Sequence, residues 1–379
     1  MLKSAFHLAL VLPGQIACGA LMFQVEPLRF DLLDKFSITN SQFGFLLSQF
    51  IIGQMIASFF AASISSRIGV KLTYLLGTGV ALAAAALFAF AATFETAFWI
   101  RFILGIGSGI QFVMGSSYIF WACSPHKRSL FQGLFGSFFN LGSGLIFLLA
   151  EGGTPADRWN LVCLAPLALL VLSFVSFAIF SHVPTHATHH AMHRHFSLLI
   201  KKPIILLAII MFGSWGTFVV LGHWLSVYLV NGIGAHIGSS AIATGIVLLF
   251  SAFGRAAGGL IAPVNSERVA LVVYSLIAAV SGLAMAWTDA IWAISAAAIV
   301  MIVASSMCFG PVLTMLPKYV DLSGRDMAIS FVLSGAMLLT TVCAPALGML
   351  LDAGAQNVSD SVWFIIAIPV IAAVAALML

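Results

Sequence analysis

The chain repeats long apolar stretches separated by short polar segments over its whole length. A helix needs roughly 20 mostly apolar residues to span a hydrocarbon core of about 30 Å. Twelve stretches reach this length, at 5–25, 43–64, 72–93, 98–122, 130–150, 160–181, 203–230, 240–262, 269–288, 291–316, 327–350 and 361–379. They lack the alternation of a membrane β-barrel, and lipid offers backbone groups no partners. The pattern therefore predicts an all-α integral membrane protein.

Composition supports this prediction and excludes other classes of protein. Hydrophobic residues make up 61% of the chain and charged residues 7%, against about 25% charged residues in an average soluble domain. The net charge of +4 comes from basic residues scattered between apolar stretches, which does not indicate nucleic-acid binding. The sequence has no lysine-containing phosphate loop and no catalytic cluster, so we expect neither ATP hydrolysis, nor an enzyme, nor a cofactor.

Basic residues orient the predicted helices. If the N-terminus is cytoplasmic, twelve basic residues are predicted on the cytoplasmic side, against Arg29, Lys35 and Arg158 outside. The twelve are Lys3, Arg67, Lys71, Lys127, Arg128, Arg194, Lys201, Lys202, Arg255, Arg268, Lys318 and Arg325. Cytoplasmic loops of membrane proteins carry an excess of Lys and Arg. Both termini are thus expected in the cytoplasm, for example of a bacterial cell with this protein in its inner membrane.

The longest predicted loop, 182–202, divides the chain into halves 1–181 and 203–379. A shift of 201 residues aligns four pairs of identical residues: Gly44 with Gly245, Leu47 with Leu248, Gly53 with Gly254 and Arg67 with Arg268. In both copies the glycines fall in an even-numbered span and the arginine follows in a short loop. The sequence thus predicts two related six-helix halves.

Two short motifs resemble those of the major facilitator superfamily of secondary transporters. The loop after the second span contains Arg67, Gly69 and Lys71 at the family's spacing, and the fourth span contains Arg101 followed by Gly105 and Gly107. The resemblance implies twelve helices in two pseudo-symmetric bundles, alternating access to a central site, and a gating loop at Arg67, Gly69 and Lys71, with Arg268 in the second copy.

The chain departs from the family's pattern in three places. Ala62 stands where the loop motif has its first glycine, and Ser66 stands where it has an aspartate that helps to lock two helices. The fifth span lacks the Gly-Pro pair that is typical of drug exporters in the family. These departures put the charged latch in doubt and weaken an interpretation as a drug exporter.

Charged residues in or near the spans are the first candidates for function, because charge in a membrane is costly. Arg101 lies inside the fourth span, where it could bind an anion, take part in proton coupling, or extend toward the interface. Glu26 and Arg29 follow the first span. Glu26 could bind a proton or mark a solvated helix end. Proton coupling is assigned to Glu26, Arg29 and His223, since histidine titrates near neutral pH.

The seventh span supplies two further candidates for the solute pathway. Trp215 and His223 lie eight positions apart, so they share one helix face. The resemblance implies that this helix lines the central cavity, and the pair would suit a polar or aromatic solute. An aromatic belt at the membrane interface is the alternative, and it fits Trp224 and Tyr228 better. The predicted pathway residues are Gln24, Arg101, Gln111, Asn140, Trp215 and His223, although buried amides often only join helices.

The middle loop is rich in histidine. His186, His189, His190 and His193 would form one stripe on a helix and could bind zinc, nickel or copper. No Asp, Glu or Cys accompanies them, so a solvated linker is the alternative.

Together these features favour a monomeric transporter that imports a small polar or anionic organic solute with protons. Export of amphiphilic compounds and a metal-related role of the histidine loop are the alternatives.

Overall fold

The computed structural model describes residues 2–124, 128–151, 154–181, 201–261, 267–320, 325–354 and 358–379, and no strand occurs within these ranges. The first group of helices is α1 (Leu2–Met22), η1 (Glu26–Leu28), α2 (Arg29–Phe36), α3 (Asn40–Phe88), α4 (Phe94–Ala122), α5 (Arg128–Leu149) and α6 (Pro155–Phe180). The second is α8 (Lys202–Val227), η4 (Tyr228–Gly232), α9 (Ile237–Ile261), α10 (Glu267–Met285), α11 (Ile291–Met307), α12 (Phe309–Met315), η5 (Leu316–Lys318), α13 (Arg325–Asp352) and α14 (Val358–Met378).

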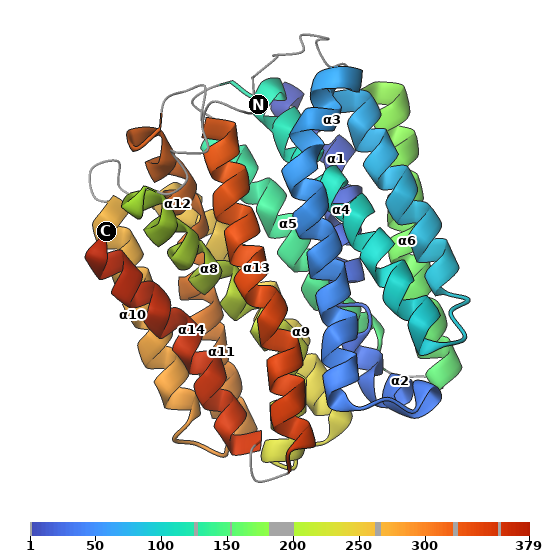
Figure 1. The fold of residues 1–379 in the computed structure, drawn as a ribbon, viewed down its shortest axis with the longest axis vertical. Helices are drawn as coiled ribbons and strands as arrows, with labels where there is room; N and C mark the ends of the chain where they lie inside the picture. Colours follow the sequence, from blue (N-terminus) through green and yellow to red (C-terminus); the bar gives the residue numbers. More distant parts are fainter. Residues whose placement is uncertain are drawn as a thin grey trace.

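The described helices confirm the prediction of an all-α membrane protein. Eleven of the described segments are long and apolar enough to cross a membrane, and the apolar helix Val362–Met378 is a shorter twelfth. Successive spans run in opposite directions, so both termini lie toward the same side, which we call the termini side (Figure 1). The short helix α2 lies on the opposite side (Figure 1). Which side faces the cytoplasm stays a prediction.

The second and third spans are joined more closely than predicted. The sequence predicts separate helices at 43–64 and 72–93, but both lie in the helical segment α3, which bends at Gly69 with φ 82° and ψ 160°. A positive φ costs glycine little because it has no Cβ. The segment begins with a capping box, in which Thr39 and Gln42 pair with each other's backbone N–H groups.

The tenth span is interrupted, as the proline in it suggests. Helix α11 ends at Met307 and α12 begins at Phe309. Pro311 follows, and because proline has no N–H it cannot bond the carbonyl four residues earlier, at Met307. Pro345 lies inside α13, which continues past it.

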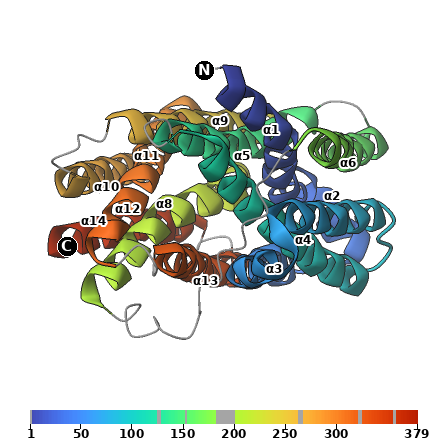
Figure 2. The same cartoon turned by 90° about the horizontal axis from the view of Figure 1, so that it is seen from above.

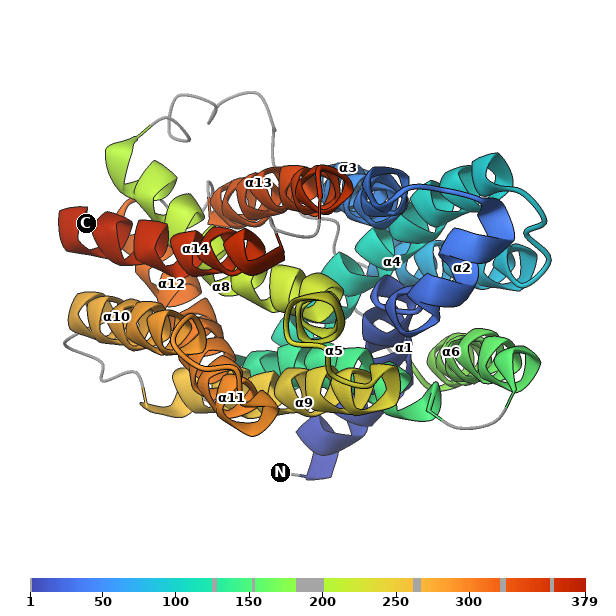
Figure 3. The same ribbon diagram turned by 90° about the horizontal axis from the view of Figure 1, so that it is seen from below.

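The helices form two bundles, α1–α6 and α8–α14, which meet along two pairs of helices (Figures 2 and 3). Helix α5 packs along α9, and α3 packs along α13. Glycines permit the close approach at both junctions. A Cβ on Gly245 would lie 3.0 Å from the Gly144 carbonyl oxygen, and a Cβ on Gly44 would lie 2.6 Å from that of Ala344.

The aligned glycines of the internal repeat occupy equivalent places. Gly44 and Gly245 each lie at a junction between bundles, as described above. Gly53 faces α4, where a Cβ would lie 2.2 Å from the Phe102 carbonyl oxygen, and Gly254 faces α11, at 2.5 Å from that of Val303. The repeat read from the sequence therefore corresponds to pseudo-symmetric packing. The exact domain boundaries remain predictions, since 182–200 lies outside the described residues.

Candidate functional site

A carboxylate and an imidazole meet between the two bundles on the opposite side. Glu26, just after α1, forms an ion pair with His223 Nδ1 on α8, and the two side chains are 3% and 1% exposed. The Phe23 ring lies 4.8 Å from the His223 ring. Glu26 is therefore not a solvated helix end. The sequence named both residues as candidates for proton coupling, but it did not predict that they would contact each other.

Arg101 lies in the second turn of α4 and joins α4 to the end of α1. Its Nη1 donates to the Leu21 carbonyl oxygen at 2.6 Å and its Nη2 to that of Met22 at 2.9 Å. The last carbonyls of a helix have no partner within the helix, and they carry partial negative charge that favours a cation. Arg101 is fully buried, so it does not extend toward an interface. Glu26 attracts it electrostatically.

Arg29 extends this cluster at the start of α2. It is buried, donates to Asn40 Oδ1, and lies 5.0 Å from the Trp224 ring centroid. Trp224 and Tyr228 are themselves buried. The alternative of a lipid-facing aromatic belt for Trp224 and Tyr228 is therefore wrong, because they pack inside the protein. We call Glu26, Arg29, Arg101 and His223 the opposite-side cluster.

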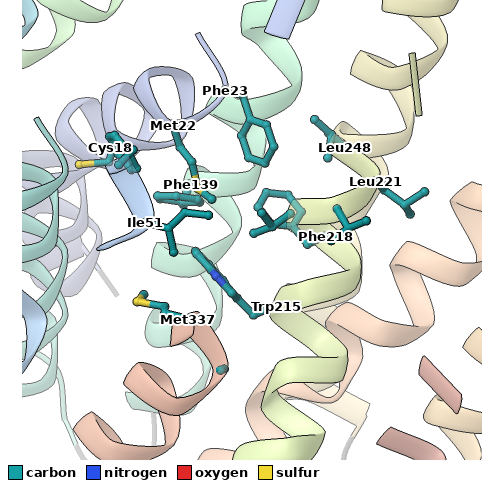
Figure 4. Close-up of a cluster of buried hydrophobic side chains, with 14 of the residues drawn as sticks. Cys18, Met22, Phe23, Ile51, Phe139, Trp215, Phe218, Leu221, Leu248 and Met337 are labelled. Atoms are coloured by element: carbon teal, nitrogen blue, oxygen red, sulfur yellow. The ribbon is translucent and has the colours of Figure 1, made fainter. Parts of the chain in front are cut away.

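Trp215 lies at the centre, where the bundles meet. Its ring lies 5.6 Å from that of Phe139 on α5 and 5.9 Å from that of Phe218. Figure 4 shows these rings facing one another, with Phe23 above them and Met337 of α13 below. Trp215 is 4% exposed. Ring contacts through Phe218 and Phe23 link it to His223, on the same helix.

The three predicted pathway amides are all buried, but they lie in different surroundings. Gln111 accepts from Cys18 Sγ at 3.2 Å and donates to the Tyr74 hydroxyl at 3.4 Å, inside the first bundle. Gln24 donates to Cys163 Sγ at 3.8 Å. These two amides join helices of one bundle. The Asn140 amide has no hydrogen-bond partner among the described residues.

The predicted gating residues lie on the termini side. Lys71 donates to the Ser181 carbonyl oxygen at 3.0 Å and so ties α3 to the end of α6. Arg268 donates to the Leu377 carbonyl oxygen at 3.0 Å. Arg67 lines a groove of about 330 Å³ beside Phe60. Their role in gating stays a prediction.

Arg255 is a buried residue that the sequence does not single out as a candidate for function. It served only to orient the predicted helices, but it lies within α9 about two turns before the helix ends, and it is 1% exposed. Phe309, Trp215 and Phe218 surround its guanidinium, with ring centroids at 4.7, 5.3 and 5.5 Å from Cζ. Its position inside the predicted span 240–262 was the signal that could have identified it. The remaining charge count still favours cytoplasmic termini.

The histidines proposed as metal ligands, His186, His189, His190 and His193, lie outside the described residues. Within the described ranges, no three residues of the His, Cys, Asp and Glu types group as metal ligands would.

Comparisons with known proteins bear on the family and the fold. A family model described as Major Facilitator Superfamily matches residues 25–325. No curated protein sequence matches the chain. Among 301 similar solved chains is one described as the crystal structure of a D-xylose-proton symporter. It has a TM-score of 0.80 and 15% identity, and the match covers 99% of this chain and 97% of that one. At this identity the likeness shows the fold alone.

Proposed function

Because the chain belongs to the Major Facilitator Superfamily and is a multi-pass membrane transporter rather than an enzyme, we propose that it carries a small polar or anionic organic solute together with protons. The two bundles would expose a central site alternately to either side of the membrane. The buried Glu26–His223 pair is the observation that carries the proposal. It is a titratable pair that joins one bundle to the other.

Protonation of this pair changes the contact between the bundles. When the pair holds one proton, a negatively charged Glu26 can face a positively charged His223 across the junction between the bundles. A second proton removes the charge of Glu26 and therefore the attraction to His223. Less free energy is then needed to separate the two bundles on the opposite side.

The test is proton movement in proteoliposomes that contain a trapped pH-sensitive dye. Addition of a transported organic acid or sugar outside wild-type vesicles should acidify the interior. Glu26→Gln should abolish the acidification while exchange of radiolabelled solute across the membrane continues. Glu95→Gln is the matched control, since Glu95 is exposed in the first turn of α4. Proton movement in the opposite direction would indicate export, and solute flux without any proton movement would contradict the proposal.

A further inference from the structure

Arg255 has too few partners for a buried arginine. Its guanidinium makes one hydrogen bond, from Nη1 to the Gly136 carbonyl oxygen at a long 3.4 Å, and Nε has no partner among the described residues. A guanidinium carries five N–H donors. No described carboxylate forms an ion pair with it. Burying an unpaired charge is costly. An anion beside the guanidinium would reduce that cost.

Other polar groups without partners occur beside it. Trp215 Nε1 is buried with no hydrogen-bond partner among the described residues, and the same is true of the Asn140 amide. The Trp215 ring lies against Arg255. Asn140 is one turn from Gly136 on α5, on the helix face that meets Arg255. Donors from α5, α8 and α9 therefore collect at one place between the bundles, and we call Arg255, Trp215, Asn140 and Phe309 the arginine cage.

Gly136 presents no side chain toward Arg255. A Cβ at this position would lie 3.6 Å from both Cδ and Nη1 of Arg255. The guanidinium thus faces a backbone carbonyl rather than a side chain on α5. Three aromatic rings, those of Phe309, Trp215 and Phe218, lie against the guanidinium, which suits a ligand with an apolar body.

We propose that Arg255 binds the carboxylate of a small organic monocarboxylate, whose apolar part packs against Trp215 and Phe309. Arginine binds carboxylates through two parallel hydrogen bonds, and Trp215 Nε1 and the Asn140 amide add neutral donors. A single cation balances a single negative charge, whereas a phosphate dianion would leave one charge buried without compensation. The inference rests on the proposed transport function, because it supplies the solute of that function, but the binding itself needs no proton gradient.

A carboxylate bound here would touch both bundles. Gly136 and Asn140 belong to the first bundle, and Arg255 and Trp215 belong to the second. The ligand would thus connect α5 to α9 along one of the two junctions that must change when access alternates.

The experiment is ligand binding to the detergent-purified full chain without a membrane gradient. All five cysteines are buried, so a thiol-reactive fluorescent dye reports unfolding. Benzoate, phenylacetate and hexanoate are the probes, and each is compared with its neutral amide. The acids, but not the amides, should raise the melting temperature. Calorimetry should show that Arg255→Gln weakens binding of the best acid by roughly 30-fold or more, and Arg255→Lys by less.

Arg158→Gln is the control, because Arg158 pairs with Asp31 at 3.1 Å far from the cage. It should keep the shift produced by the acid. Arg255→Gln should lose that shift while its own melting temperature, without ligand, does not fall. A retained acid shift in Arg255→Gln, equal shifts from acid and amide, or no shift with any of the three acids overturns the proposal. Glu26→Gln should still bind the acid, so a failure of proton coupling is distinguishable from a failure of this site.

Discussion

Arg101 and Arg255 are both buried arginines within membrane spans, but their surroundings differ. Arg101 donates to two carbonyls at the end of α1 and has Glu26 nearby. Arg255 has one long hydrogen bond, three aromatic rings and no described carboxylate partner. Burial of the guanidinium costs free energy at both positions. Arg101 recovers part of this cost from two carbonyls and Glu26, whereas Arg255 has its one long hydrogen bond and ring contacts, each ring contact worth about 0.5–2 kcal/mol.

The difference shows that burial alone does not identify a ligand-binding arginine. A buried arginine whose donors are used by the backbone holds helices together. One whose donors are unused keeps a charge that only a ligand can satisfy, at a cost to the stability of the ligand-free protein. We therefore expect stability measurements to separate the two roles.

The largest expected effect on stability comes from removing the charge of Arg101 or that of Arg255. Arg101→Gln should lower the free energy of unfolding by about 3 kcal/mol, because it leaves carbonyls of α1 and Glu26 without their cation. Arg255→Gln should leave it unchanged or raise it. Thiol-dye melting curves of the two variants, without ligand, provide the measurement. Equal losses of stability in both variants would mean that Arg255 is a structural residue too.

The fold could be predicted largely from the sequence, because membrane spans depend on length and hydropathy, which are local properties. The twelve spans follow from runs of about 20 apolar residues, and the repeat of Gly44 and Gly245 indicated the symmetry. Helix α2 was not predicted, since its eight residues mix polar and apolar types. The continuity of α3 was missed because the bend depends on the backbone angles of Gly69.

The candidate site was less predictable, because local sequence patterns do not determine which helices far apart in the chain contact each other. Glu26 and His223 stood out as rare titratable residues, yet nothing in the sequence showed that α1 and α8 bring them together. Arg255 was visible inside a predicted span, but it was used only to orient the helices and was not considered as a candidate for function. The rule that drew attention to Arg101, that charge within a span is informative, applied equally to Arg255.

A smaller effect should come from methyl groups added beside the two arginine sites. At Gly222, next to His223, a Cβ would lie 2.2 Å from Phe23 Cε1. The Phe23 ring is itself held by Phe218 at 5.3 Å, so Gly222→Ala should cost about 2 kcal/mol through overpacking. At Gly136 the same change meets only ordinary contacts at 3.6 Å, and stability should be kept. Thiol-dye melting curves of Gly222→Ala and Gly136→Ala provide the measurement. Equal stability of the two variants would contradict the expected difference in packing.

The smallest expected effect concerns Asp352, which joins α13 to the start of α3 near the opposite-side cluster. Asp352, the last residue of α13, accepts from the backbone N–H groups of Asn40 at 3.0 Å and Ser41 at 2.9 Å. A carboxylate at a helix N-terminus is worth about 1 kcal/mol. Asp352→Asn should therefore speed hydrogen exchange in the first turn of α3 about fivefold, and leave acid binding at the arginine cage intact. The exposed Asp289 supplies the control, Asp289→Asn, which should leave this exchange unchanged. Unaltered exchange in Asp352→Asn would show that the junction between α3 and α13 is held by its packed glycines alone.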